Sequence, residues 1–178
     1  MFQQIFLDMD GIFVDFDAGV RERYNNDWHP TEWAIPYREF GTTFKEFWDG
    51  IDFPGFWRGL PWTEDGKRIR SIIEPMRPII LTCAVLPYAM PGKMQWLKKH
   101  WPDVIKEKRV IITAGHEAKA AVSGPGKILI DDKNENIDEW NEAGGTGILY
   151  PRPWNKLAGT PYPLEYLMSS LMLALGGK

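Results

Sequence analysis

The chain lacks the features that mark several large classes of protein. With a single cysteine, Cys83, it cannot build the internal disulfide framework of a small secreted domain. No apolar run is long enough to cross a bilayer, and no basic, apolar leader opens the sequence. Its 21 basic and 24 acidic side chains leave a net charge of −3, so we expect no basic surface for nucleic acid or anionic membranes. These absences favour a cytoplasmic protein with no membrane and no stable nucleic-acid partner.

Aromatic residues, by contrast, are abundant and concentrated in one region. The chain has nine tryptophans, most of them before residue 63. Residues 27–62 contain many rings, prolines and glycines but no alternating strand pattern. Within this stretch, rings recur at helical spacing at Phe40, Phe44, Phe47 and Trp48. We therefore expect a small, mainly helical cap domain over residues 18–75, inserted after the first strand of a core domain formed by residues 1–17 and 76–178.

The rest of the chain alternates between short apolar runs and amphipathic helical patterns. Five runs have the length and hydrophobicity of buried parallel strands, at residues 5–7, 79–81, 110–112, 127–130 and 147–150. Helical spacing lies between and after them, at residues 18–26, 63–76, 91–101, 135–143 and 164–175. Strands that alternate with helices predict an α/β fold with a Rossmann-like, doubly wound and mainly parallel sheet.

Polar side chains stand where three of the predicted strands end. They are Asp8 and Asp10 after the first strand, Thr82 in the second, and Asp131 and Asp132 after the fourth. Crossover connections place these strand ends on one edge of a parallel sheet, and Gly11 allows the chain to turn there. Four carboxylates at one edge would repel one another unless a cation neutralises them. All-oxygen ligands favour a hard cation, most simply Mg²⁺.

Such an edge suits phosphoryl chemistry. Mg²⁺ held by carboxylates keeps coordination positions open for phosphate oxygens. A hydroxyl such as that of Thr82 and an ammonium group such as that of Lys119 or Lys93 would hold the other phosphoryl oxygens. An aspartate can itself act as the nucleophile and form an acyl phosphate that water then hydrolyses.

Taken in order, these residues resemble the motifs of a known superfamily. The four motifs of the haloacid-dehalogenase-like hydrolases have counterparts in Asp8-Met9-Asp10-Gly11, in the strand ending at Thr82, in Lys119 and in Asp131-Asp132. Within that superfamily the chain is similar to the 5′(3′)-deoxyribonucleotidases. The similarity lies in the opening at residues 8–16, the lysine ahead of a tryptophan at residues 93–96, and the segment at residues 129–133. Those proteins also carry a small helical cap inserted right after the first motif.

The resemblance implies roles for the acidic residues. Asp8 would be the nucleophile, and Asp10 would protonate the leaving oxygen and then act as the base for water. Mg²⁺ would be held by Asp8, the backbone carbonyl of Asp10, and Asp131. Asp132 would lie close by or act through water.

The resemblance also implies a set of groups that bind the phosphoryl oxygens. Thr82 and Lys119 would bind them, with Lys93 as a weaker candidate. Cys83 takes the next phosphate-binding position, where the family commonly has a serine. This departure leaves the exact set of phosphate donors open.

The rings of the expected cap have two explanations. A small cap has little core volume, so most of its rings are needed for packing. A nucleobase, however, offers a flat face, and stacking on it is worth ~1–3 kcal/mol per base. We expect one to three rings of the following set to line a base pocket: Phe40, Phe44, Trp48, Trp57 and Trp62.

The residues and the resemblance together predict a Mg²⁺-dependent phosphomonoesterase. We expect it to hydrolyse nucleoside monophosphates, above all 5′(3′)-deoxyribonucleotides, through an aspartyl phosphate. A non-nucleotide metabolite and a polynucleotide 3′ end are the alternative substrates. A protein that binds a phosphorylated ligand without turnover is a further alternative, which the intact acidic motifs disfavour. The sequence leaves the oligomeric state open, a homodimer included.

Overall fold

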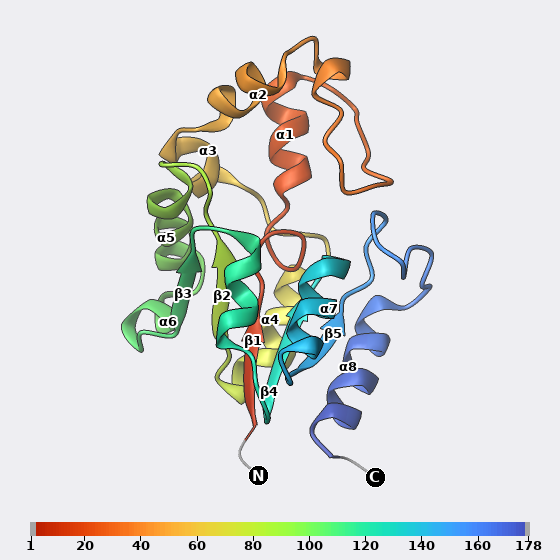
Figure 1. The fold of residues 1–178 in the computed structure, drawn as a ribbon. Coiled ribbons are helices and arrows are strands. Elements are labelled where there is room, and N and C mark those ends of the chain that lie inside the picture. Colours follow the sequence, from red (N-terminus) through yellow and green to blue (C-terminus); the bar gives the residue numbers. More distant parts are fainter. Residues whose placement is uncertain (1–2, 177–178) are drawn as a thin grey trace.

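The computed structural model describes residues 3–176, apart from the side chains of residues 116–118, and these form a central parallel sheet (Figure 1). The strands are β1 (Gln4–Leu7), β2 (Ile79–Cys83), β3 (Val110–Thr113), β4 (Lys127–Asp131) and β5 (Thr146–Leu149). Their order is β3-β2-β1-β4-β5, and each neighbouring pair is parallel. The predicted doubly wound α/β fold is confirmed, and each expected strand is present.

Successive residues of the strands pack into different helical layers. Leu7 and Ile80 belong to the larger buried cluster on one face of the sheet. Phe6 and Leu81, each one position along, belong to a smaller cluster on the other face. Because both faces are covered, the strands are apolar throughout instead of alternating.

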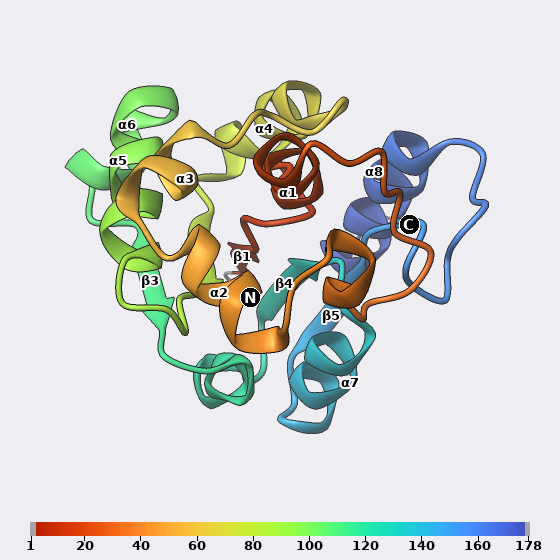
Figure 2. The same cartoon turned by 90° about the horizontal axis from the view of Figure 1, so that it is seen from above.

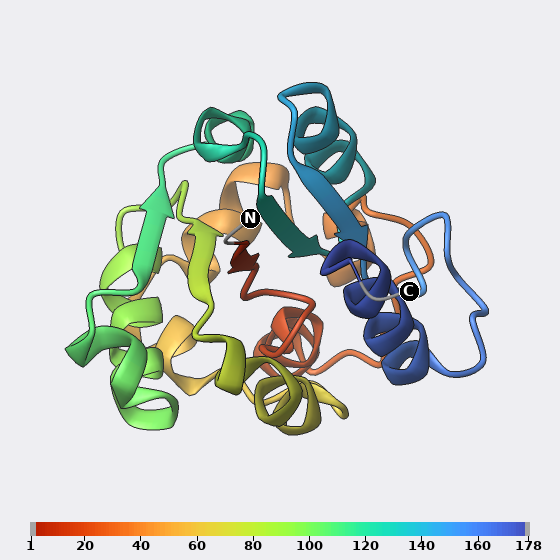
Figure 3. The same cartoon turned by 90° about the horizontal axis from the view of Figure 1, so that it is seen from below.

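The two layers of helices are unequal (Figure 3). One face carries α4 (Gly66–Ile73), α5 (Ala89–His100), α6 (Pro102–Lys106) and α8 (Pro163–Ala174), with the short η2 (Glu74–Met76) after α4. The other face carries η3 (His116–Val122) and α7 (Asn134–Glu142). Within the described part of the chain, no helix combines the length and the apolar character needed to cross a membrane.

A helical segment of residues 16–62, here called the cap, lies over the carboxyl ends of the strands (Figures 1 and 2). It contains α1 (Phe16–Tyr24), η1 (Tyr37–Phe40), α2 (Phe44–Ile51) and α3 (Pro54–Gly59). α2 begins with a capping box, in which Thr43 and Glu46 each accept a hydrogen bond from the other's backbone N–H. Rings supply the interior: Phe47 stacks on Tyr24 and on Phe40, with ring centroids 5.1 and 5.6 Å apart.

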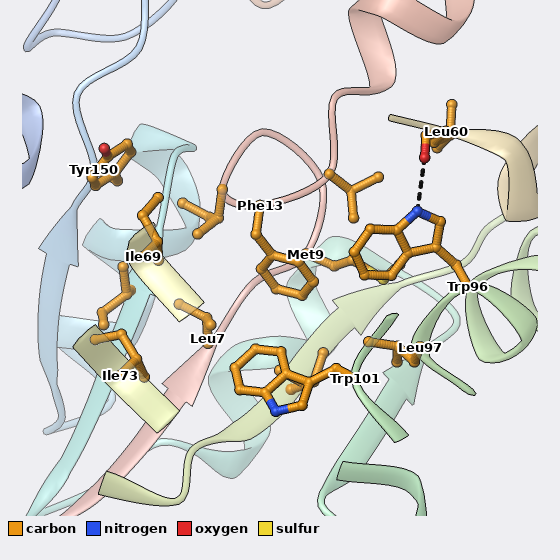
Figure 4. Packing of buried hydrophobic residues seen from close by; sticks show 14 of the residues in the cluster. Leu7, Met9, Phe13, Leu60, Ile69, Ile73, Trp96, Leu97, Trp101 and Tyr150 are labelled. Atoms are coloured by element: carbon orange, nitrogen blue, oxygen red, sulfur yellow. Dashed lines mark hydrogen bonds between the residues drawn. The ribbon is translucent and has the colours of Figure 1, made fainter. Parts of the chain in front are cut away.

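One helix of the predicted cap range packs with the core instead. α4 lies beside β1 and below the cap helices, and its Ile69 and Ile73 are buried near Leu7 (Figures 1 and 4). The chain rejoins the core just before α4, where the backbone N–H of Thr63 donates to the carbonyl of Phe13 at 3.2 Å. The apolar stripe of α4 needs the sheet face for its burial, so the cap ends earlier than residue 75.

Several tryptophans of the chain are structural residues of the core (Figure 4). Trp96 and Trp101 are fully buried, with ring centroids 5.6 and 5.7 Å from that of Phe13. The indole Nε1 of Trp96 donates to the carbonyl of Leu60 at 2.8 Å. This bond joins α5 to the end of the cap, so the core helps to fix where the cap sits.

Candidate active site

The carboxyl ends of β1, β2 and β4 meet beneath the cap. These strands are adjacent in the sheet, so residues that are far apart in the sequence lie together at its edge. Asp8, Thr82, Asp131 and Asp132 are all buried there. Gly11 permits the close approach, because its φ is +72° and a Cβ on it would lie 2.2 Å from Asp132 Oδ2.

Lys119 joins two of the carboxylates. Its Nζ lies 2.8 Å from Asp8 Oδ1 and 2.7 Å from Asp131 Oδ2, and the side chain is almost fully buried. Burial alone would lower the pKa of Lys119, but Asp131 and Asp8 raise it above its usual value, so the amine is charged. Asn136 Nδ2 donates to both oxygens of Asp131 at 3.0 and 2.9 Å, which fixes the orientation of that carboxylate.

Asp8 and Asp132 are less completely neutralised. Burial raises the pKa of Asp8 to about 6, although Lys119 acts in the opposite direction. Burial and the charge of Asp131 raise the pKa of Asp132 well above its usual value. Asp132 Oδ2 accepts a hydrogen bond from Trp154 Nε1 at 2.7 Å, whereas its buried Oδ1 has no partner among the described residues. An ionised carboxylate in this position is costly without a neighbouring cation.

The geometry fits a hard divalent cation. One carboxylate oxygen from each of Asp8, Asp131 and Asp132 lies within 4.8 Å of the others. An all-oxygen donor set with an unpaired oxygen and raised carboxyl pKa values suits Mg²⁺. The side chain of Asp10 is not in this group; its carboxylate pairs with Lys93 instead.

Lys93, from α5, organises the other half of the edge. Its Nζ donates to Thr82 Oγ1 at 2.9 Å and to the carbonyl of Cys83 at 2.7 Å, and it also binds the Asp10 carboxylate. Asp10 keeps its other oxygen, Oδ1, without a partner among the described residues. Burial raises the pKa of the Cys83 thiol, so this residue is a neutral thiol and no activated nucleophile. The structure thus brings both candidate lysines to the edge, and each binds a different set of residues there.

A cavity of about 500 Å³ extends from this edge to the cap. Its core wall includes all but one of the predicted catalytic, phosphate-binding and metal residues: Asp8, Asp10, Thr82, Cys83, Lys93, Lys119 and Asp132. Its cap wall is mainly aromatic: Phe16, Trp28, Trp33, Tyr37, Phe44, Phe47, Trp48 and Trp57. The size suits a small-molecule site that has one polar and one apolar end.

Three of the five candidate rings of the cap line this cavity: Phe44, Trp48 and Trp57. The other two lie elsewhere. Phe40 packs inside the cap, with its ring centroid 5.4 Å from that of Tyr24. Trp62 packs in the core, 4.8 Å from the ring of Trp96. Both rings pack against other rings, and neither is among the residues that line the cavity.

Several residues that line the cavity were not predicted as site residues. Asp15 and Asp17, which follow the first motif, are expected from the sequence to cap or hinge a helix; Asp15 does cap α1, whereas Asp17 lines the cavity beside Phe16. Trp33 lies in an irregular part of the cap, and Trp154 lies in the loop after β5. Neither loop has a periodic pattern, so neither ring could be placed from the sequence.

Comparisons with known proteins identify the family to which the chain belongs. A sequence model of the family described as 5′ nucleotidase, deoxy (Pyrimidine), cytosolic type C protein matches residues 2–160. Among solved structures, the HAD family enzyme bt-2542 from Bacteroides thetaiotaomicron is similar, with 11% identity, a TM-score of 0.38, and 87% of this chain and 96% of that chain covered. A Thermotoga maritima protein assigned as a beta-phosphoglucomutase has 14% identity and a TM-score of 0.45, with 92% and 91% covered. No curated protein matches the chain.

The two solved structures are too distant to support any argument about the site. The family match is different, because it spans most of the chain and includes every residue of the edge described above. On this evidence the protein belongs to the 5′ nucleotidase, deoxy (Pyrimidine), cytosolic type C family, and it is a haloacid-dehalogenase-like phosphoric monoester hydrolase.

Proposed function

We propose that this nucleotidase hydrolyses deoxyribonucleoside monophosphates to nucleoside and phosphate, that it depends on Mg²⁺, and that Asp8 carries the phosphoryl group between the two half-reactions. The observation that carries the proposal is one continuous cavity that joins the carboxylate edge to a wall of aromatic rings. One end fits a phosphate ester, and the other fits a flat, mainly apolar group such as a nucleobase.

Asp8 is the carboxylate best placed to accept the phosphoryl group. One of its oxygens is held by Lys119 at 2.8 Å, and the other makes no hydrogen bond to the described residues. Asp8 also lines the cavity, whereas Asp131 is not among its lining residues and is bound by Lys119 and Asn136. When bound by Asp8, Asp131 and Asp132, Mg²⁺ would supply positive charge to the phosphoryl oxygens.

Thr82 and the two lysines would hold the remaining phosphoryl oxygens. Thr82 Oγ1 accepts a hydrogen bond from Lys93, so its own proton is free to be donated to a phosphoryl oxygen. Lys93 and Lys119 are both buried in the cavity wall, where their charges act through a medium of low dielectric. Because their partners hold these groups in place, little reorganisation is needed when the substrate binds.

Asp10 is the proposed acid and base of the reaction. Lys93 holds one oxygen of its carboxylate, and the other is without a protein partner among the described residues. In the first step Asp10 would give a proton to the leaving oxygen of the nucleoside. In the second step it would take a proton from the water that attacks the phosphoryl group on Asp8.

The cap would recognise the base. Phe44 is 61% exposed, which is unusual for so apolar a ring, and a bound base would cover it. Trp48 lies next to it, with ring centroids 6.1 Å apart. These two rings form the proposed base pocket, and Trp57 lines the same cavity with its ring centroid 5.5 Å from Lys93 Nζ. The family's description as cytosolic agrees with the cytoplasmic location that we propose.

Phosphate release from a panel of ribo- and deoxyribonucleoside 5′- and 3′-monophosphates tests the proposal. With Mg²⁺, we expect the deoxyribonucleotides to give the highest kcat/KM, well above p-nitrophenyl phosphate and sugar phosphates. EDTA should abolish the activity, and added Mg²⁺ should restore it. Asp131→Ala should raise the Mg²⁺ concentration needed for half-maximal rate, because one of the three clustered carboxylates is lost. Faster hydrolysis of a sugar phosphate than of every nucleotide would refute the proposed substrate class.

A further inference from the structure

The first turn of α1 places a carboxylate in the cavity wall that the reaction proposed above does not use. Asp17 lines the cavity beside Phe16 and is half-buried. Its side chain makes no hydrogen bond or ion pair with any other described residue. Asp15, two positions earlier, is different: its Oδ1 caps the helix by accepting from the backbone N–H of Ala18 at 2.8 Å. Helix capping therefore accounts for Asp15 and leaves Asp17 without a structural partner.

Asp17 lines the same cavity as Asp8 and Asp10, so its carboxyl group borders the space open to the leaving alcohol of a bound ester. Burial raises its pKa to about 7; the nearby charges of Asp15 and Asp10 add to that shift, and those of Arg21 and Arg152 oppose it. Asp10 is the proposed proton donor to the leaving oxygen. Asp10 and Asp17 line the same cavity, so both carboxyl groups border the space in which that alcohol would be held.

Two arginines outside the cavity lining act on Asp17, but each has another partner. Arg21 donates to the carbonyl of Trp28, and Arg152 pairs with Asp65. Among the described residues, no basic side chain that lines the cavity is free to pair with Asp17. The basic groups that line it, among the described residues, are Lys93 and Lys119, and both are bound to carboxylates of the core edge. The carboxylates on the cap wall are Asp17 and Glu32, and the latter is exposed. This wall therefore offers hydrogen-bond acceptors among apolar rings, and it would repel a second anionic group on the substrate.

We propose that Asp17 determines specificity for the leaving alcohol, by accepting a hydrogen bond from a free hydroxyl of the substrate's sugar and by disfavouring substrates that carry a second phosphate there. This inference rests on the nucleotidase function proposed above. A sugar hydroxyl next to the ester is the donor that a nucleoside monophosphate brings to this place. A hydrogen bond from a hydroxyl to an ionised carboxylate is stronger than one between two neutral groups.

The test compares substrates that differ by one group, at pH 8, where Asp17 is largely ionised. The substrates are a 2′-deoxyribonucleoside 5′-monophosphate, its 2′,3′-dideoxy analogue and its 3′,5′-bisphosphate. We expect the wild-type enzyme to prefer the hydroxyl-bearing monophosphate over the dideoxy analogue about tenfold in kcat/KM. Asp17→Ala should abolish that preference: kcat/KM should fall for the hydroxyl-bearing monophosphate and change little for the dideoxy analogue. Asp17→Asn removes the charge and should raise the rate on the bisphosphate relative to the monophosphate about tenfold.

Asp15→Asn is the matched control, because it makes the same change two residues earlier while asparagine still caps the helix. It should alter neither substrate ratio. A wild-type enzyme that hydrolyses both monophosphates equally well, or an Asp17→Ala enzyme that loses activity on both to the same extent, would overturn the role of Asp17 and leave the nucleotidase function intact. Hydrolysis of p-nitrophenyl phosphate but of no nucleotide would overturn the proposed function, and this inference with it.

Discussion

The two walls of the cavity are built by opposite physical means. The core wall is built around buried polar and charged groups that hold one another in place, as Lys119 does with Asp8 and Asp131. The cap wall consists of rings that pack by area and shape, with few polar contacts. A buried polar network loses most of its value when one member is removed, whereas a ring cluster loses roughly the contribution of the missing ring. Changes in the core wall should therefore affect every substrate, and changes in the cap wall should affect some substrates only.

The largest effect should come from the nucleophile. Asp8→Asn keeps the size of the side chain and removes the anionic oxygen, so turnover should fall by about 10³-fold or more on every substrate. The fold should survive, because the variant replaces a buried carboxylate with a neutral amide of the same size. Burial already disfavours the charge of that carboxylate and raises its pKa to about 6. Phosphate release and thermal unfolding measure the two effects. Retention of a substantial part of the activity on any substrate would refute the covalent role of Asp8.

Removal of Lys119 should affect both activity and stability. Lys119→Met leaves the carboxylates of Asp8 and Asp131 without their shared cation, and breaking a buried pair costs ~3–5 kcal/mol. In EDTA the melting temperature should fall by about 10 °C, and added Mg²⁺ should recover part of that loss. Lys156→Met is the control, because Lys156 and its partner Asp138 are each more than half exposed. Equal melting temperatures for the two variants would contradict the prediction that Lys119 stabilises the fold.

On the cap wall, Trp48→Leu should separate substrates. The ring lines the cavity, so its loss should lower kcat/KM for nucleoside monophosphates about tenfold, the value of one stacking contact. Hydrolysis of p-nitrophenyl phosphate, which brings no base, should change little. Trp62→Leu makes the same substitution in a ring that packs against Trp96 in the core. That control should lower the melting temperature and reduce both activities together. If Trp48→Leu behaves in the same way as Trp62→Leu, the proposed base pocket is wrong.

The smallest effect concerns pH and Asp17, a carboxylate of the cap wall. The folded state raises the pKa of Asp17 from 3.8 to about 7, so it binds a proton that the unfolded chain has already released. The stability that this proton contributes is present below pH 3.8 and is lost as the pH rises to about 7. In EDTA, the wild-type melting temperature should therefore fall more between pH 5 and pH 8 than that of Asp17→Asn, by about 5 °C. Parallel pH profiles for the two proteins would show that Asp17 has an ordinary pKa.

The acidic edge of the site could be predicted because its signals are local. A short apolar run followed by Asp8 and Asp10 has the form of a buried strand with carboxylates at its end, and the run before Asp131 has the same form. Parallel pairing then leaves one edge on which they can meet. The same reasoning failed for Trp33 and Trp154, because irregular segments have no period from which a side chain can be placed.

The sequence by itself determined the α/β fold, the edge where the carboxylates gather and the presence of a ring-rich insertion, because periodicity and strand ends are encoded by neighbouring residues. Only the tertiary structure decided that α4 packs with the core and that Phe44 and Trp48 face the cavity while Phe40 and Trp62 do not. An aromatic ring is equally apolar in both settings, and its partners come from distant parts of the chain. Which face of a ring remains uncovered is therefore a property of the packed molecule.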